Sequence, residues 1–277
     1  MKNQFNIYLF SFLALILFST SCSSSDIFCV KGKGNTITQE RQVASFTAVE
    51  SLGSFTVHLF QDSSITTQEV TISAQENIIN LIKTRISGQS LIIDTDECYT
   101  TKEEVIITIR TPALSQIVLA GSGDIILKDT PRTTTNLELI LDGSGTIRTT
   151  PNFPIIASSN CTAKMKGSGT MELELQSTTK VNASISGSGK ITLRGTANEN
   201  DLSITGSGDI KAFSLPVLKS KADITGSGRI EISAIDTTVP SRATVNAKIS
   251  GSGSIYIKGN AIVESNVSGS GKVERVN

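Results

Sequence analysis

The sequence predicts an all-β protein, a parallel β-helix (a solenoid) with a less regular, β-rich region capping its N-terminal end. Three observations predict this fold class. The triplet Gly-Ser-Gly occurs eight times, apolar and polar residues alternate on both sides of each triplet, and the composition includes 22 glycines and no tryptophan. Self-similarity at a period of about 20 residues indicates a solenoid, in which each unit covers the apolar face of its neighbour.

Each triplet is predicted to be a corner between two half-buried strands. The residues two before and two after every triplet are only Leu, Ile, Val or Met, and period-two alternation indicates strands. Glycine reaches positive φ without strain and leaves room where stacked side chains would collide. The serines between the glycines, from Ser122 to Ser270, are expected to form a hydroxyl column that satisfies corner backbone groups rather than a ligand site. The predicted repeat corners are Gly121, Gly143, Gly167, Gly187, Gly206, Gly226, Gly251 and Gly269.

Outward-facing charges agree with stacking of one unit on the next. If equivalent positions of consecutive units touch, opposite charges meet much more often than like ones, and each pair contributes about 0.2–1 kcal/mol. Asp209 would lie between Lys190 and Arg229. The other expected neighbours are Arg148 with Glu172, Lys211 with Glu231, Asp142 with Lys166, and Asp223 with Lys248.

The N-terminus has the pattern of an export signal. Lys2 precedes a short apolar run that ends in small residues just before Cys22, which is typical of a secretory signal peptide over residues 1–21. Cys22 resembles the acylated cysteine of a bacterial lipobox, although Ser19 stands where such boxes usually carry Leu or Val. Ordinary signal cleavage is the alternative. If Cys22 is acylated, residues 22–37 form a lipid-anchored tether, and this lipid attaches the chain to the membrane.

The remainder divides into residues 38–115, a β-rich region continuous with the solenoid, and residues 116–277, the triplet-repeat β-helix. Solenoid ends need a cover against edge-to-edge pairing, and we expect residues 38–115 to provide it at the first unit. Within them, residues 76–86 suit one short helix or a loose turn. At the far end Arg275 interrupts an inward apolar column, which suits a solvent-facing or covered last unit.

Three cysteines follow Cys22. Cys29 and Cys98 form a disulfide if the fold brings them together, which the sequence leaves open. Cys161 has inward parity and is interpreted as a small buried hydrophobe.

The runs RQVASFTAVESLGSFTVHLFQ, VTISAQENIINLIKTRISGQSLIID and VIITIRTPALSQIVLAGSGDI, followed by the triplets, resemble the head GIN domain family (DUF2807), described as auto-transporter adhesins. The resemblance covers residues 38–277. It implies a right-handed β-helical fold on exported, often lipid-anchored bacterial proteins, and it offers no catalytic motif to carry over.

The sequence shows little support for catalysis. His58 is the only histidine and is expected on the surface, so no catalytic triad and no zinc site is indicated. Asp124 and Asp209 are the best carboxylate pair for a polysaccharide lyase or hydrolase, but they lie four units, about 19 Å, apart, too far for paired glycosidase carboxylates. A formal net charge of zero argues against nucleic acid. No cofactor and no metal is expected.

The sequence therefore predicts a non-catalytic lipoprotein of the bacterial cell envelope, at the outer membrane or cell surface. Its rigid surface would serve adhesion or bind a surface glycan or protein. A carbohydrate-active β-helix enzyme and a purely structural envelope spacer are the alternatives. The only binding-residue candidate is Tyr256, an aromatic in a column of charged and small residues.

Overall fold

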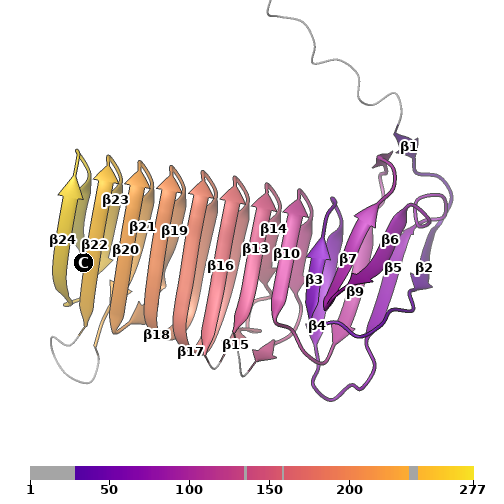
Figure 1. The fold of residues 1–277 in the computed structure, drawn as a ribbon, viewed down its shortest axis with the longest axis horizontal. Helices are drawn as coiled ribbons and strands as arrows, with labels where there is room; N and C mark the ends of the chain where they lie inside the picture. The colour runs from indigo at the N-terminus through magenta and orange to yellow at the C-terminus, as the bar shows by residue number, and fades with distance from the viewer. Residues whose placement is uncertain (1–28, 134–135, 158, 237–242) are drawn as a thin grey trace, which may run out of the picture.

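The structure, a computed structural model, describes residues 29–133, 136–157, 159–236 and 243–277. Every element of helix or strand in these residues is a strand. The strands lie side by side in a long stack that runs from β2 (Thr36–Glu40) at one end to β24 (Ile262–Ser268) at the other (Figure 1). The prediction of an all-β protein is confirmed. The predicted signal peptide and Cys22 lie outside the described residues.

The regular part of the stack has two faces. Strands that precede the triplets pair in parallel with their equivalents in the next unit and form what we call the pre-triplet sheet, and strands that follow the triplets form the post-triplet sheet. We call one strand of each sheet together with its corner a rung. The pre-triplet sheet contains β10 (Gln116–Gly121), β13 (Leu137–Gly143), β16 (Asn160–Gly167), the second halves of β17 (Thr170–Gly187) and β18 (Lys190–Gly206), β20 (Lys219–Gly226), β22 (Thr244–Gly251) and β24.

The post-triplet sheet is built in the same way. Its members are β11 (Asp124–Leu127), β14 (Thr146–Thr149), the first halves of β17 and β18, β19 (Asp209–Val217), β21 (Arg229–Ala234), β23 (Ser254–Lys258) and β25 (Lys272–Val276). At the bend opposite the corners, β12 (Arg132–Thr133) and β15 (Ile155–Ala157) also pair in parallel.

The core fills the space between the two sheets. Inward residues of each strand are buried and outward ones are exposed or half-buried, as the alternation predicts. Cys161 is fully buried between Leu137 and Val181 of the neighbouring rungs. Because each inward side chain contacts its equivalent above and below, one continuous apolar core runs along the stack.

The corner glycines adopt a backbone that other residues rarely reach. The first glycine of every triplet has positive φ, from 107° at Gly167 to 148° at Gly121. A side chain there would also overlap the preceding rung: a Cβ on Gly187 would overlap the carbonyl oxygen of Gly167. Both requirements are met by glycine alone. The serines between the glycines stand in a column, and at its end the Ser270 hydroxyl donates to Ser252 Oγ over 3.0 Å.

The register confirms the expected charge neighbours. Asp209 pairs with Lys190 on one side and Arg229 on the other, and the other four predicted pairs are also direct neighbours. Close ion pairs in the described residues are different ones, such as Lys164 with Glu138 at 2.7 Å and Lys219 with Glu199 at 3.1 Å. Asp223 is 2.7 Å from Lys221 of its own strand.

Before the first triplet, the chain adds two further rungs out of sequence order. The rung of β3 (Ala48–Ser51) and β4 (Thr56–Gln61) stacks directly on β10 and β11. The rung of β7 (Ser90–Thr95) and β9 (Ile106–Thr111) stacks on the outside of β3 and β4, although it follows them in the chain. The first rung of the stack is thus formed by a later segment.

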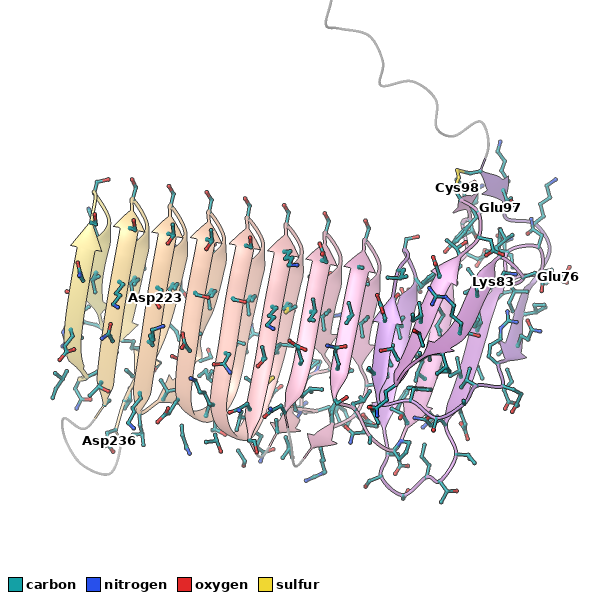
Figure 2. The ribbon with its side chains drawn as sticks, viewed as in Figure 1. Glu76, Lys83, Glu97, Cys98, Asp223 and Asp236 are labelled. Carbon is teal, nitrogen blue, oxygen red and sulfur yellow. A yellow bond between two sulfur atoms is a disulfide. The ribbon has the colours of Figure 1, made fainter. Side chains whose placement is uncertain are left out.

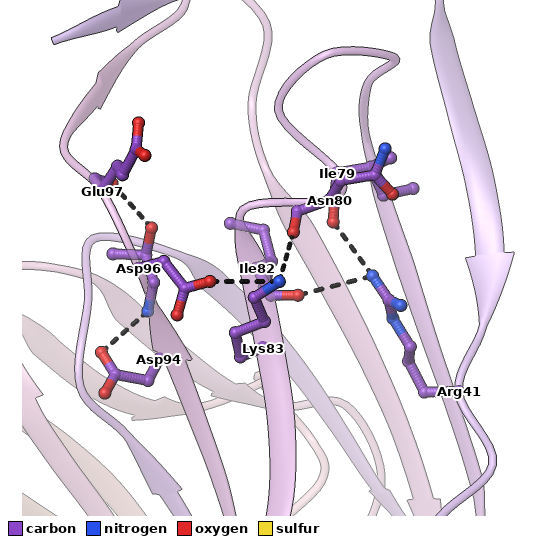
Figure 3. Close-up of polar contacts among 9 residues, drawn as sticks. Arg41, Ile79, Asn80, Ile82, Lys83, Asp94, Asp96 and Glu97 are labelled. Carbon is purple, nitrogen blue, oxygen red and sulfur yellow. Dashed lines mark hydrogen bonds and ion pairs between the residues drawn. The ribbon is translucent and has the colours of Figure 1, made fainter.

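Antiparallel strands cover this end. β6 (Ile82–Ser87) pairs with β7, while β5 (Glu69–Gln75) pairs with β9 and β2 with β5. Residues 76–81 form turns, the second of the two predicted alternatives. Arg41 Nη2 donates to the carbonyl oxygens of Ile79 (2.9 Å) and Ile82 (3.4 Å) and fixes this segment, and Lys83 lies 3.1 Å from Asp96 (Figure 3).

A disulfide fastens the start of the described chain to the same end. Cys29 is bonded to Cys98, 69 residues away, and the adjoining β1 (Val30–Lys31) pairs in parallel with β8 (Tyr99–Thr100). Cys98 lies at the end of the molecule opposite β24 (Figure 2).

Candidate functional site

The residues singled out from the sequence do not gather into one site. Asp124 and Asp209 share a column of the post-triplet sheet but are separated by Thr146, Thr170 and Lys190, so they are four rungs apart, as predicted. His58 is half-buried on the outer face of β4 beside Ile126. Burial, assisted by the positive charge of Lys128, lowers the pKa of His58, so its imidazole is neutral at pH 7.

Tyr256 lies on the outer face of β23, between Glu231 and Glu274 of the neighbouring rungs. It is half-buried, and the Arg229 guanidinium carbon is 5.3 Å from the centre of its ring. A cation over the ring is favourable. The same contact occupies one ring face, so a ligand that stacked on that face of Tyr256 would first displace Arg229.

A hollow of about 290 Å³ opens on the post-triplet sheet, near the bend opposite the corners. Three successive rungs supply its charged side chains: Arg148 from β14, Glu172 and Glu174 from β17, and Arg194 from β18. We call this cavity the charged hollow, after these four side chains. Its lining is completed by Thr149, Pro151 and Leu173. Parallel register explains the arrangement, because Arg148 pairs with Glu172 and Glu174 pairs with Arg194.

A turn after β14 forms part of the wall of the hollow. After β14 the chain leaves the ladder at Pro151 and Asn152, where Asn152 has a positive φ of 68°. The amide N of Asn152 is 3.4 Å from Glu174 Oε2, and the Thr149 hydroxyl accepts from the amide of Glu174 at 3.0 Å. These contacts set the Glu174 backbone and side chain, so the wall of the hollow is held by the rigid ladder.

The hollow contains two positive and two negative side chains, so its net charge is zero. Among the described residues, no ion pair within 4.0 Å joins any two of its four charged side chains. Arg148 and Glu174 are half-buried, and Glu172 and Arg194 are exposed. Two guanidinium groups and two carboxylates can therefore donate to and accept from the hydroxyl, amide or charged groups of one polar ligand.

A second, wider hollow of about 390 Å³ lies on the pre-triplet sheet. Its polar lining comes from the outward residues of β20, β22 and β24, namely Asp223, Thr225, Lys248, Ser250, Asn266 and Ser268. Its carboxylate Asp223 is already engaged by Lys221 at 2.7 Å. The charged hollow thus has the larger number of uncommitted charged groups.

Sequence reasoning identified only half of the charged hollow. Arg148 and Glu172 were visible as charge neighbours, but Glu174 and Arg194 were not. The available signal was a second opposite-charge pair, formed by Glu174, two residues after Glu172, and Arg194 of the following rung.

In the part of the chain that the structure describes, no group of three or more His, Cys, Asp or Glu side chains is placed to hold a metal ion. The same residues include no helix that is long and apolar enough to cross a membrane.

Residues 45–261 match the family described as "Putative auto-transporter adhesin, head GIN domain" (DUF2807). The chain belongs to this family. No curated protein matches the chain.

Solved structures of similar fold come from species of Parabacteroides and Bacteroides. A "putative adhesin" from Parabacteroides merdae is 26% identical, with a TM-score of 0.78, over 90% of this chain and 99% of that one. A "putative lipid binding protein" from Parabacteroides distasonis is 24% identical, with the same TM-score and coverage. A "putative adhesin" from Bacteroides fragilis is 20% identical, with a TM-score of 0.60, over 89% of this chain and 100% of that one. The fold is thus shared with proteins of low sequence identity.

Proposed function

We propose that this head GIN domain protein is a non-catalytic binding protein of the bacterial cell envelope, and that the charged hollow contacts its partner, a surface glycan or protein. The observation that carries the proposal is the hollow itself, in which four charged side chains on rigid neighbouring strands are left without ion pairs among themselves. The adhesin names of the family and of the Parabacteroides merdae relative agree with a binding role.

The chain is further proposed to be exported and anchored through an acylated Cys22 after removal of residues 1–21. The Cys29–Cys98 disulfide supports export, because disulfides persist in oxidising compartments. Residues 22–37 remain the proposed tether region, residues 38–115 the capping region, and residues 116–277 the repeat. The coil is proposed to be a right-handed β-helix, because parallel strands joined by crossovers are right-handed in about 98% of cases.

Lipid binding, the activity in the name of the Parabacteroides distasonis protein, finds less support. The described inward residues fill the space between the sheets, and most are fully buried. Both hollows carry charged and polar side chains beside their apolar surface, and charged groups are poor partners for acyl chains.

The test uses the full chain with Cys22→Ser, which removes the proposed anchor. This protein and its double variant R148A/R194A are compared for binding to a glycan array and to immobilised envelope extracts. A matched control, K166A/K248A, removes two positive charges from the opposite sheet. We expect the wild-type chain and the control to bind and the R148A/R194A variant to lose at least about tenfold in affinity, or about 1.4 kcal/mol.

Three results would contradict the proposal. Equal binding by both double variants would remove the hollow from the interface. Release of reducing or unsaturated sugars from a polysaccharide panel would favour the enzyme alternative, and self-association without any other binding would favour the structural spacer.

A further inference from the structure

The two ends of the stack differ in how their edges are closed. At the N-terminal end, the antiparallel strands β6 and β5 pair with the last parallel strands, β7 and β9, and β2 pairs in turn with β5. Figure 1 shows β6 crossing the direction of the stacked strands. At the other end, β24 and β25 are paired on one side only in the described chain, with β22 and β23. This C-terminal end keeps the regular geometry of every internal rung.

Apolar side chains are partly uncovered at the C-terminal end. Val267 occupies an inward position beneath Ile249 and is 40% exposed, whereas Ile249 is 2% exposed. Val263 and Val273 are half-buried. Unpaired edge strands with an apolar end face are a template for pairing with another chain, and an identical end of a second copy is such a partner.

Arg275 is the exception in this layer. It continues an inward column that runs through Ala212, Ile232 and Ile257, all fully buried. Its Nη2 donates to the carbonyl oxygen of Ala261 at 2.6 Å and its Nη1 to that of Gly259 at 3.3 Å. The guanidinium is thus bound across the end of the stack, above the core, while the residue remains exposed to water.

We propose that Arg275 blocks self-association of the C-terminal end with a second copy of this chain. A copy docked on β24 and β25 would bury two Arg275 guanidinium groups near each other and strip their remaining donors of water. Burying like charges without counter-ions is strongly unfavourable, and inward-pointing charges are a recognised device for protecting sheet edges. Contact between two identical ends closes on itself, so removing the charge produces a dimer rather than a fibre.

The experiment measures sedimentation velocity of the full chain with Cys22→Ser over a wide concentration range. R275M removes the charge and keeps an unbranched side chain of similar length, while R275K keeps the charge. K272M is the matched control, since Lys272 lies in the same strand with its side chain 70% exposed on the outer face. We expect R275M to form dimers with a dissociation constant at least about tenfold lower than that of the wild type. R275K and K272M are expected to sediment as the wild type does.

Folding is checked by thermal unfolding of each variant. If R275M loses its folded structure, R275Q takes its place, because it removes the charge and retains an amide donor for the Ala261 carbonyl. A folded, uncharged variant that remains as monomeric as the wild type overturns the proposal. So does K272M dimerising as strongly as R275M, or a wild-type chain that already dimerises through this end.

Discussion

Cys161 shows how one inward position is set by its column. It lies between Leu137 and Val181 with no exposed surface, and burial raises the pKa of its thiol to about 12. The reactive form of cysteine is the thiolate, so this side chain is chemically silent in the folded protein and acts only through packing.

In the chain with Cys22→Ser, Cys161 is the only free thiol, because Cys29 and Cys98 are bonded. We expect no reaction with a thiol reagent under native conditions and full reaction of one thiol in denaturant, followed by absorbance or mass spectrometry. Rapid labelling of Cys161 in the native chain would show that the column is not packed as described.

Glu138 gives a pH-dependent prediction. Hydrogen bonds from Lys164 Nζ (2.7 Å) and Gln116 Nε2 (2.8 Å) lower its pKa. A lowered carboxyl pKa contributes stability that is present above the unfolded-state pKa of about 4.5 and is lost as pH falls through the folded-state value.

E138Q should therefore lower the free energy of unfolding at pH 7 by only about 0.5 kcal/mol, since the pair is solvent-screened. The difference from wild type should vanish in acid below the folded-state pKa. Urea unfolding at the two pH values measures it. A difference that grows in acid would have the wrong sign for this account.

At the scale of the elements, the corner is the repeated unit. Its glycines satisfy two separate demands, a positive φ and close contact with the preceding corner. G187A combines backbone strain with overlap of the Gly167 carbonyl and should cost about 2–4 kcal/mol of unfolding free energy. G88A, where φ is +59° and space is open, should cost only about 1–2 kcal/mol of strain. Denaturant midpoints of the two variants decide this, and equal losses would show that stacking contact at the corner is unimportant.

The alternation around each triplet was enough to predict strands, inward columns and the neighbours of Asp209, because these follow from a period of two and from superposition of corners. The placement of β7 and β9 outside β3 and β4 was not predictable, since the corner at Gly53 lacks the full triplet and the spatial order departs from chain order. The charged hollow was only half predictable because its shape depends on how the chain turns at Pro151 and Asn152, which the ladder pattern does not encode.

For the whole molecule, the disulfide is the covalent tie between the start of the described chain and the capping end. Closing a loop of 69 residues reduces the freedom of the unfolded chain and is typically worth about 2–4 kcal/mol. C29S/C98S should unfold at correspondingly lower urea concentration. The wild-type chain should match it when a reductant is added, and an unchanged midpoint in both cases would contradict a stabilising role for the bond.

The claim on which the hollow, the charge neighbours and the exposed end all depend is that consecutive corners lie directly above one another. It is tested most directly by oxidative cross-linking of cysteine pairs in the serine column of the Cys22→Ser chain. S188C/S207C places the Cα atoms one rung, about 4.8 Å, apart, within the range for a disulfide, whereas S188C/S227C places them about 9.6 Å apart, outside it. We expect the first pair to form an intramolecular disulfide quantitatively and the second to remain reduced. Equal bonding in both pairs, or bonding only in the second, would contradict in-register stacking.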